Sequence, residues 1–91
     1  MISKVGPGWR KLVEPIVAKA AEEGVTIFDI KEKFGALRVY TAPGSDVLEN
    51  MIDRAEDASR CTCEFCGKSG SLRTERRWFK TLCDECDKSE A

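Results

Sequence analysis

The chain has 91 residues, of which 42% are hydrophobic, and its 15 basic and 16 acidic side chains leave a net charge of −1. A chain this short forms one small domain, and its limited core calls for an additional cross-link such as a metal site. The charge balance argues against a protein held on nucleic acid by bulk electrostatics. No apolar run approaches the length of a membrane span, so we expect no membrane partner.

The first predicted element is a helix over residues 9–20, capped at its C-terminal end by Gly24. Its apolar residues recur at the spacing of one helical face. They are Trp9, Leu12, Val13, Ile16, Val17 and Ala20. Pro15 lies inside this pattern, where its ring would clash with the carbonyl group of Lys11. We expect one helix kinked at Pro15; the alternative is a short first turn followed by a helix that starts there.

Two β-strands are predicted next, Val25–Ile30 and Ala36–Thr41, because both segments are rich in β-branched and aromatic residues. Residues 32–35 fit the loop of a hairpin, with Gly35 in the left-handed conformation. A second helix should follow, with Asp46 as its N-cap and Glu49 as the partner in a capping box. Its predicted buried stripe consists of Val47, Leu48, Met51, Ile52, Ala55 and Ala58.

The most specific feature of the sequence is a pair of Cys-x-x-Cys motifs, Cys63–Cys66 and Cys83–Cys86. Four thiolates at this spacing suit tetrahedral Zn²⁺, and Gly67 supplies the permissive backbone that the first turn needs. Residues 71–74 and 78–82 between the motifs read as a β-hairpin, and residues 87–91 as a polar tail. The predicted fold is therefore a small α+β protein, with an α-β-β-α core over residues 1–60. A four-cysteine zinc-ribbon module over residues 61–91 packs on that core and holds one structural Zn²⁺.

The five cysteines leave other arrangements open. A disulfide framework is disfavoured by the odd count and by the absence of a signal peptide, which together indicate a reducing cytoplasm. A thioredoxin-like dithiol would need a βαβ frame that the pattern does not contain. Cys61 could replace Cys63 as a ligand, although the motif spacing and Gly67 favour Cys63. We expect Cys61 to be a buried or half-exposed free thiol.

One block of sequence carries a resemblance to known proteins. It is the segment Ile30–Tyr40 (IKEKFGALRVY), with Gly8-Trp9 upstream and the two cysteine motifs downstream. Over nearly the whole chain, the sequence resembles a family of small, largely uncharacterised proteins encoded by bacteriophages and prophages. The resemblance implies a phage-type accessory protein in the cytoplasm of a bacterial host. It implies no catalytic activity.

The residues themselves also argue against an enzyme. The chain has no histidine, its adjacent acidic residues are sequence neighbours on solvated faces, and it lacks a glycine-rich phosphate loop. Four thiolates would leave no open position on the metal. We therefore expect neither catalysis nor a small-molecule substrate.

The predicted partner surface lies on the second hairpin, where cations alternate with an aromatic ring. Its residues are Arg73, Arg76, Arg77, Trp78 and Lys80. Because Trp and Arg are enriched at interface hot spots, we expect a host protein as partner, such as a host enzyme or defence component that is inhibited or modulated. The alternative is a nucleic-acid-binding regulator that uses the basic aromatic hairpin 72–82. Lys31, Lys33 and Arg38 on the first hairpin form a second candidate patch.

Overall fold

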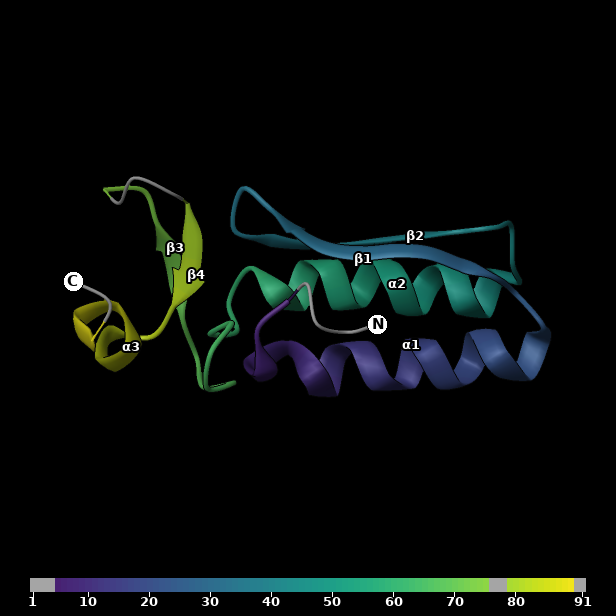
Figure 1. Cartoon of the computed structure of the whole chain (residues 1–91), viewed down its shortest axis with the longest axis horizontal. Helices are drawn as coiled ribbons and strands as arrows, with labels where there is room; N and C mark the ends of the chain where they lie inside the picture. The colour runs from purple at the N-terminus through teal and green to yellow at the C-terminus, as the bar shows by residue number, and fades with distance from the viewer. Residues whose placement is uncertain (1–4, 76–78, 90–91) are drawn as a thin grey trace.

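The computed structural model describes residues 5–75 and 79–89 of the chain. The molecule is elongated, with extents of 41 × 20 × 19 Å, and its two hairpins lie one after the other along the long axis (Figure 1). In chain order the elements are the 3-10 turn η2 (Pro7–Trp9), α1 (Arg10–Glu23), β1 (Ile27–Lys33), β2 (Ala36–Thr41), α2 (Asp46–Ser59), β3 (Ser71–Arg73), β4 (Lys80–Leu82) and α3 (Asp84–Ser89). This order confirms a small mixed fold with two antiparallel hairpins and adds a third helix.

Helix α1 is one helix that includes Pro15, which agrees with the predicted single helix and not with the alternative of a helix that starts at Pro15. Figure 1 draws α1 as one uninterrupted helix. Gly24 closes the helix with a φ of 71°, and its N–H group donates to the carbonyl groups of Ala20 and Ala21. Proline has no N–H group and removes one hydrogen bond from the helix. The helix tolerates this loss because it is long and buries much apolar surface.

The first hairpin differs from the prediction in where β1 begins and ends. β1 starts two residues later than predicted and continues to Lys33, which pairs directly with Ala36. The connection therefore consists of Phe34 and Gly35 alone, with φ angles of 53° and 84°. Two consecutive left-handed residues match the twist of a two-residue hairpin turn. The predicted loop over residues 32–35 is wrong at its first two positions, which continue the strand.

Helix α2 covers the outer edge of β2. The N–H group of Val39 donates to the carboxylate of Glu56 at 3.1 Å, and that of Leu37 donates to the hydroxyl of Ser59 at 2.9 Å. These strand N–H groups point away from β1, so α2 satisfies groups that would otherwise form an open sheet edge. Two polar side chains of α2 thus fix how the helix sits against the hairpin.

The N-terminal end of α2 corrects a second prediction. The N-cap is Ser45, whose hydroxyl accepts from the N–H group of Leu48 at 3.1 Å, whereas Asp46 is the first residue of the helix. The carboxylate of Glu23 in α1 also accepts from both the N–H group and the hydroxyl of Ser45. Ser45 rather than Asp46 is the N-cap for two reasons. Its backbone is extended, as a capping residue requires, and Glu23 of α1 fixes it by hydrogen bonds.

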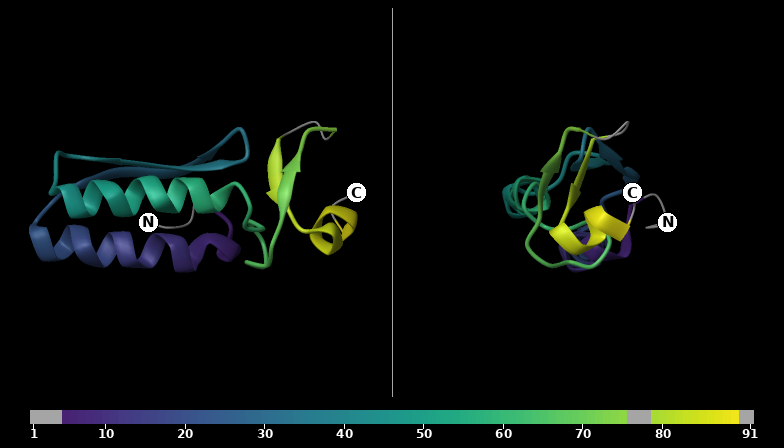
Figure 2. Two further views of the ribbon diagram at one scale, coloured as in Figure 1. Left: turned by 180° about the vertical axis from the view of Figure 1, so that it is seen from behind. Right: turned by 90° about the vertical axis from the view of Figure 1, so that its left-hand side faces the viewer.

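The main core lies between the β1–β2 hairpin and the two long helices (Figure 2). Its buried residues are Val5, Trp9, Val13, Ile16, Ala20, Ile30, Leu37, Val39, Leu48, Ile52 and Ala55. Full burial of a large apolar side chain contributes roughly 1.5–3 kcal/mol each, so this cluster supplies most of the driving force for folding. Val47, predicted to be buried in α2, is 56% exposed, and Ser59 is buried on that face in addition to the predicted residues.

The second hairpin, β3–β4, is short, and α3 follows it directly. The polar tail predicted from Asp87 onward is wrong as far as Ser89, because these residues belong to α3; residues 90 and 91 lie outside the described part of the chain. The backbone N–H group of Asp87 donates to the carbonyl group of Cys83 at 2.9 Å. The last cysteine motif therefore ends inside a helical turn.

Candidate metal centre

The first cysteine motif lies in a tight loop that follows α2. The N–H group of Cys63 donates to the carbonyl group of Lys68 at 2.7 Å, and the N–H group of Gly67 donates back to the carbonyl group of Cys63 at 3.0 Å. Gly67 has a φ of 84°, a conformation that a residue with a Cβ adopts only with strain. The glycine predicted from sequence therefore closes the loop that turns both sulfur atoms inward.

The second motif spans the end of β4 and the first turn of α3. Cys83 comes directly after β4, and the N–H group of Cys86 donates to the Sγ atom of Cys83 at 3.4 Å. The contact joins the two cysteines of the motif directly, backbone nitrogen to sulfur. The helical turn brings Cys86 back toward Cys83 and gives the motif its spacing.

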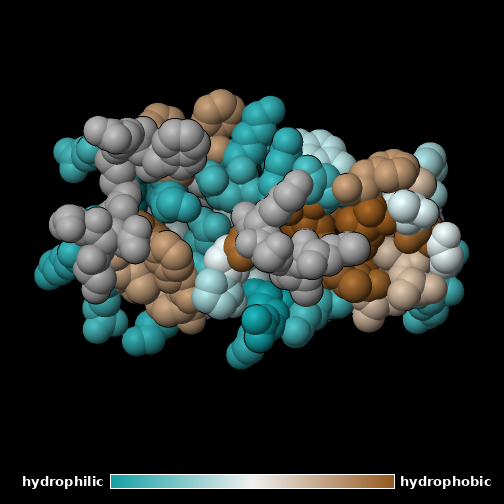
Figure 3. All heavy atoms as spheres, in the orientation of Figure 1, coloured by the Kyte–Doolittle hydropathy of each residue, from teal (hydrophilic) through white to brown (hydrophobic). Residues whose placement is uncertain are grey.

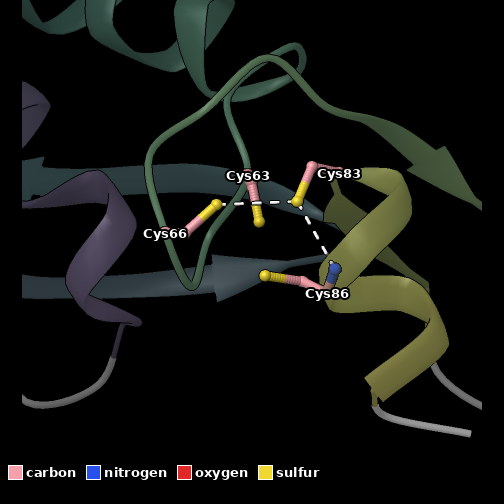
Figure 4. Close-up of side chains that lie close together, drawn as sticks. All are labelled: Cys63, Cys66, Cys83 and Cys86. Atoms are coloured by element: carbon pink, nitrogen blue, oxygen red, sulfur yellow. Dashed lines mark hydrogen bonds between the residues drawn. The ribbon is translucent and has the colours of Figure 1, made fainter.

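All four predicted cysteines converge. Their Sγ atoms lie within 4.8 Å of one another, and those of Cys66 and Cys83 are 3.5 Å apart. Figure 4 shows the four side chains pointing toward a common centre from the loop after α2 and from the start of α3. Four sulfur atoms around Zn²⁺ at about 2.3 Å would be about 3.8 Å apart, so the observed cluster has the dimensions of a metal site.

The protonation of the cluster also suits a cation. Burial alone would raise the pKa of Cys63, but hydrogen bonds from the backbone of Cys66, Cys83 and Phe65 outweigh it and lower that pKa to about 6. The pKa of Cys86 is raised, chiefly by its hydrogen bonds with the sulfur atoms of Cys83 and Cys63. One sulfur atom is thus ionised at neutral pH while a neighbour is kept protonated. A divalent cation would favour the thiolate form of the sulfur atoms that bind it.

Cys61 lies outside the cluster. Its thiol is exposed rather than buried or half-exposed as predicted, and its Sγ atom is 3.5 Å from the carbonyl oxygen of Ala58 at the end of α2. The bridge between Thr62 and Ser69 separates it from the loop that carries Cys63. The geometry therefore selects Cys63 over Cys61 as the member of the four-sulfur set.

Glu64, between the first two cysteines, is a residue of the site that the sequence did not indicate. It is 4% exposed, and its carboxylate accepts from the N–H group of Gly6 at 3.0 Å and pairs with the Nζ atom of Lys80 at 3.5 Å. Its own N–H group donates to the carbonyl group of Thr81 at 3.0 Å. A buried charge needs partners of this kind, and here they tie the metal loop to both β4 and the N-terminal segment.

Two contacts from the N-terminal segment hold the same loop. The N–H group of Gly8 donates to the carbonyl group of Glu64 at 2.6 Å. The indole N–H group of Trp9 donates to the carbonyl group of Thr62 at 2.8 Å. A Cβ atom on Gly8 would lie 2.1 Å from the carbonyl oxygen of Cys63, so only glycine allows this approach. The Gly8-Trp9 pair stood out in the sequence, but nothing there indicated that it contacts the cysteine loop.

The predicted partner surface is described only in part. The guanidinium group of Arg73 donates to the carbonyl group of Leu82 at 2.9 Å and pairs with Asp84 at 2.8 Å, which leaves its side chain 22% exposed. Lys80 pairs with Glu64, and its Nζ atom lies 5.8 Å from the centre of the Phe65 ring. Both cations thus make structural contacts beside the metal loop. Arg76, Arg77 and Trp78 lie outside the described residues.

No family model matches the chain, and no curated protein and no solved structure matches it. Over residues 5–75 and 79–89, none of the helices combines the length and the hydrophobicity needed to cross a lipid bilayer.

Proposed function

We propose that the four clustered cysteines bind one structural Zn²⁺ and that the chain is a non-enzymatic accessory protein of phage type, which binds a host protein in the bacterial cytoplasm. The observation that carries the metal assignment is the convergence of Cys63, Cys66, Cys83 and Cys86 within 4.8 Å. With zinc in place, the loop after α2, the β3–β4 hairpin and the first turn of α3 make up a zinc ribbon. Sulfur ligands select zinc over harder cations such as Mg²⁺ or Ca²⁺.

The metal would act on the fold rather than on a substrate. Four thiolates complete the tetrahedral shell of Zn²⁺, so no position remains for water or substrate. The second hairpin needs such support because its own buried cluster is small, consisting of Cys63, Leu82 and Cys83 with Phe65 and Cys86 packed against it. Binding free energy at a structural zinc site is folding free energy, which a cluster of this size cannot supply alone.

The exposed apolar side chains of the second hairpin support a protein partner. Leu72 is 46% exposed and Phe79 is 42% exposed, and both lie on the same hairpin as the residues of the predicted partner surface. Exposed apolar groups beside arginines are typical of the residues that anchor protein interfaces. The alternative of a nucleic-acid-binding regulator on this hairpin is weakened by Arg73 and Lys80, whose charges are paired within the chain.

A pull-down from bacterial lysate tests this proposal. Zinc-loaded, tagged protein should retain a specific host protein whether or not the lysate is treated with nuclease. The double variant Arg76→Ala/Arg77→Ala should lose that protein while keeping its circular dichroism spectrum and its zinc. The matched control, Arg10→Ala/Arg54→Ala on the exposed faces of α1 and α2, should retain it. Capture that disappears with nuclease, or that survives in the hairpin variant, would contradict a protein interface at this hairpin.

A further inference from the structure

The β1–β2 hairpin has an outer face that turns away from both long helices (Figures 1 and 2). We define this outer face by its exposed or half-exposed aromatic and basic side chains. They are Lys31, Lys33, Arg38 and Tyr40 on the strands, together with the exposed rings of Phe28, at the register irregularity of β1, and Phe34, in the turn. The opposite face of the hairpin, with Ile30, Leu37 and Val39, is buried in the core. The outer face is thus available to a partner.

Three aromatic rings of the outer face are in contact with solvent. Phe34 is 71% exposed, Phe28 is 68% exposed and Tyr40 is 41% exposed. Exposed rings do not contribute to the core, and several of them on one small surface indicate an interaction site. In Figure 3, hydrophilic side chains lie between the hydrophobic ones along the upper edge of the molecule, over β1 and β2. Along this edge, hydrophobic groups are therefore separated by polar ones rather than merged into one apolar patch.

The cations of this face include a pair that does not help the fold. Lys31 and Arg38 are direct cross-strand partners, and like charges in that relationship are destabilising. Arg38 also lies 3.6 Å from the carboxylate of Glu56 in α2, at the rim of the face, so its charge is partly balanced there. Lys31 therefore adds positive charge beside a position that is already basic.

Each lysine of the outer face lies beside an exposed ring. The Nζ atom of Lys31 is 5.3 Å from the centre of the Tyr40 ring, and that of Lys33 is 5.9 Å from the centre of the Phe34 ring. Contacts of this kind contribute about 0.5–1 kcal/mol at exposed sites. They hold the two cations next to the flat surfaces that a ligand would use.

Phe34, like the Lys31–Arg38 pair, is a residue whose position is not explained by a gain in stability. It occupies the first position of the two-residue turn with a φ of 53°, where asparagine or glycine is favoured and a bulky side chain is strained. The strain places its ring at the tip of the hairpin instead of in the core. Departures from local preference that lie together on one surface are expected at functional sites.

We propose that this outer face binds single-stranded nucleic acid, with bases stacked on the rings of Phe28, Phe34 and Tyr40 and phosphates close to the two lysines and Arg38. Proteins that hold single strands without sequence preference combine these two elements, flat rings for the bases and cations for the backbone. The acidic side chain paired across the strands with Tyr40 is Asp29, so the cations outnumber the carboxylates on this face of a chain that is slightly acidic overall. This local positive charge complements a polyanion.

The inference does not rest on the proposed function, because it concerns the first hairpin and the host-protein surface lies on the second. The alternation of rings and cations also favours nucleic acid over a protein on the outer face. A protein interface has a core depleted of charge, whereas stacked bases leave a phosphate beside every ring. A duplex hides its bases and should bind less well than a single strand.

Fluorescence anisotropy with the zinc-loaded protein tests the proposal. The probes are labelled mixed-sequence DNA and RNA strands of about 20 nucleotides, longer than the usual site of a single-strand-binding domain, and the same DNA as a duplex. The wild-type protein should bind a single strand more tightly than the duplex and lose affinity as salt rises from about 50 to about 200 mM. The DNA and RNA arms show which of the two strands is preferred.

Two variants separate binding from folding. Phe34→Asn supplies a better turn residue, and Lys31→Glu replaces a repulsive cross-strand pair with an attractive one, so both should keep or raise the melting temperature. Each should weaken single-strand binding by about fivefold or more, as the loss of one stacking or phosphate contact does. The matched control, Lys11→Glu on the exposed side of α1, makes the same change of charge and should leave binding within about twofold of wild type.

Three results would overturn the proposal. The first is the absence of single-strand binding up to about 100 µM protein at low salt, the weak end of non-specific nucleic-acid affinity. The second is an equal loss of affinity in Lys11→Glu, which would mean that only overall charge matters. The third is a bacterial protein that wild type retains and Lys31→Glu does not, in the absence of oligonucleotide binding, since the face would then be a protein interface.

Discussion

The hydroxyl of Thr81 donates to the carbonyl oxygen of Gly35 at 2.6 Å, so that the last strand of the second hairpin is bonded to the turn of the first. The two residues are 46 positions apart, and Thr81 is 1% exposed. Leu72 of β3 lies against the same turn, because a Cβ atom on Gly35 would be 2.5 Å from its Cδ1 atom. The metal-bearing hairpin therefore meets the first hairpin end to end through a buried hydrogen bond.

Thr81→Val tests this junction. Valine keeps the shape of threonine but leaves the Gly35 carbonyl group without its donor, and an unsatisfied buried polar group costs about 1–3 kcal/mol. Chemical denaturation of the zinc-loaded protein should show a loss of that size. Thr74→Val makes the same change at an exposed position after β3 and should lose less than about 0.5 kcal/mol. Equal losses in both variants would mean that the hydrogen bond to Gly35 does not stabilise the junction.

Gly8→Ala tests the contact between the N-terminal segment and the cysteine loop. Its new Cβ atom would lie 2.1 Å from the carbonyl oxygen of Cys63 and 2.6 Å from the backbone nitrogen of Gly67, so the two backbones must separate. We expect a loss of more than about 2 kcal/mol in the free energy of unfolding, because the clash is with backbone atoms and breaks the hydrogen bond to Glu64.

Gly24→Ala is the matched control for this substitution. Gly24 has a φ of 71° with open space around its Cβ position, so alanine meets only the strain of the left-handed conformation, about 1 kcal/mol. Gly8→Ala should also weaken zinc binding, measured by competition with a chelator, whereas Gly24→Ala should not. If both variants were equally stable, the N-terminal segment would not hold the loop that carries Cys63.

The sequence predicted the elements that depend on local patterns. Helix periodicity gave α1 with its Gly24 cap, and motif spacing gave the four cysteines that converge. The sequence-based prediction failed where a residue far away in the chain determines the local structure. Ser45 caps α2 in place of Asp46 because Glu23, in another helix, holds it. Neither the burial of Glu64 nor the approach of Gly8 to the cysteine loop has a local signal, since both depend on how the N-terminal segment crosses that loop.

The missed helix has a similar cause. Residues Asp84–Ser89 have no apolar periodicity, and from Asp87 onward the sequence indicates a polar tail. The turn forms because Cys83 accepts the N–H groups of both Cys86 and Asp87, through its sulfur atom and its carbonyl group. Arg73, a predicted partner residue, pairs with Asp84 in the first turn of this helix. These contacts come from Cys83 and from Arg73 in β3, so a periodicity search along the segment does not find them.

The link between Glu23 and Ser45 predicts a pH dependence. Hydrogen bonds from the hydroxyl and then the N–H group of Ser45 lower the pKa of Glu23 from its ordinary 4.5. The folded state therefore favours the carboxylate. Its stabilisation is complete above pH 4.5 and is lost as the pH falls through the lowered pKa. The difference in unfolding free energy between wild type and Glu23→Gln should be largest near neutrality and shrink in acid.

Ser45→Ala provides the control for this profile. It removes the hydroxyl that donates to Glu23, so Glu23→Gln introduced into that background should have a smaller effect and a flatter pH profile. Denaturant unfolding across the acid range measures all four proteins. A Glu23→Gln effect that is independent of pH, or unchanged by the loss of the Ser45 hydroxyl, would mean that the hydrogen bonds do not stabilise the carboxylate.

The zinc content of the purified protein, measured by elemental analysis beside the variants Cys61→Ser and Cys63→Ser, tests the central claim most directly. These cysteines are two residues apart, but only Cys63 belongs to the cluster of sulfur atoms within 4.8 Å. We predict close to one equivalent of zinc in wild type and in Cys61→Ser, and loss of the metal together with the fold of the second hairpin in Cys63→Ser. Two results would contradict the account. The first is a metal-free wild-type protein that melts at the same temperature as the zinc-loaded protein. The second is zinc that is lost in Cys61→Ser and kept in Cys63→Ser.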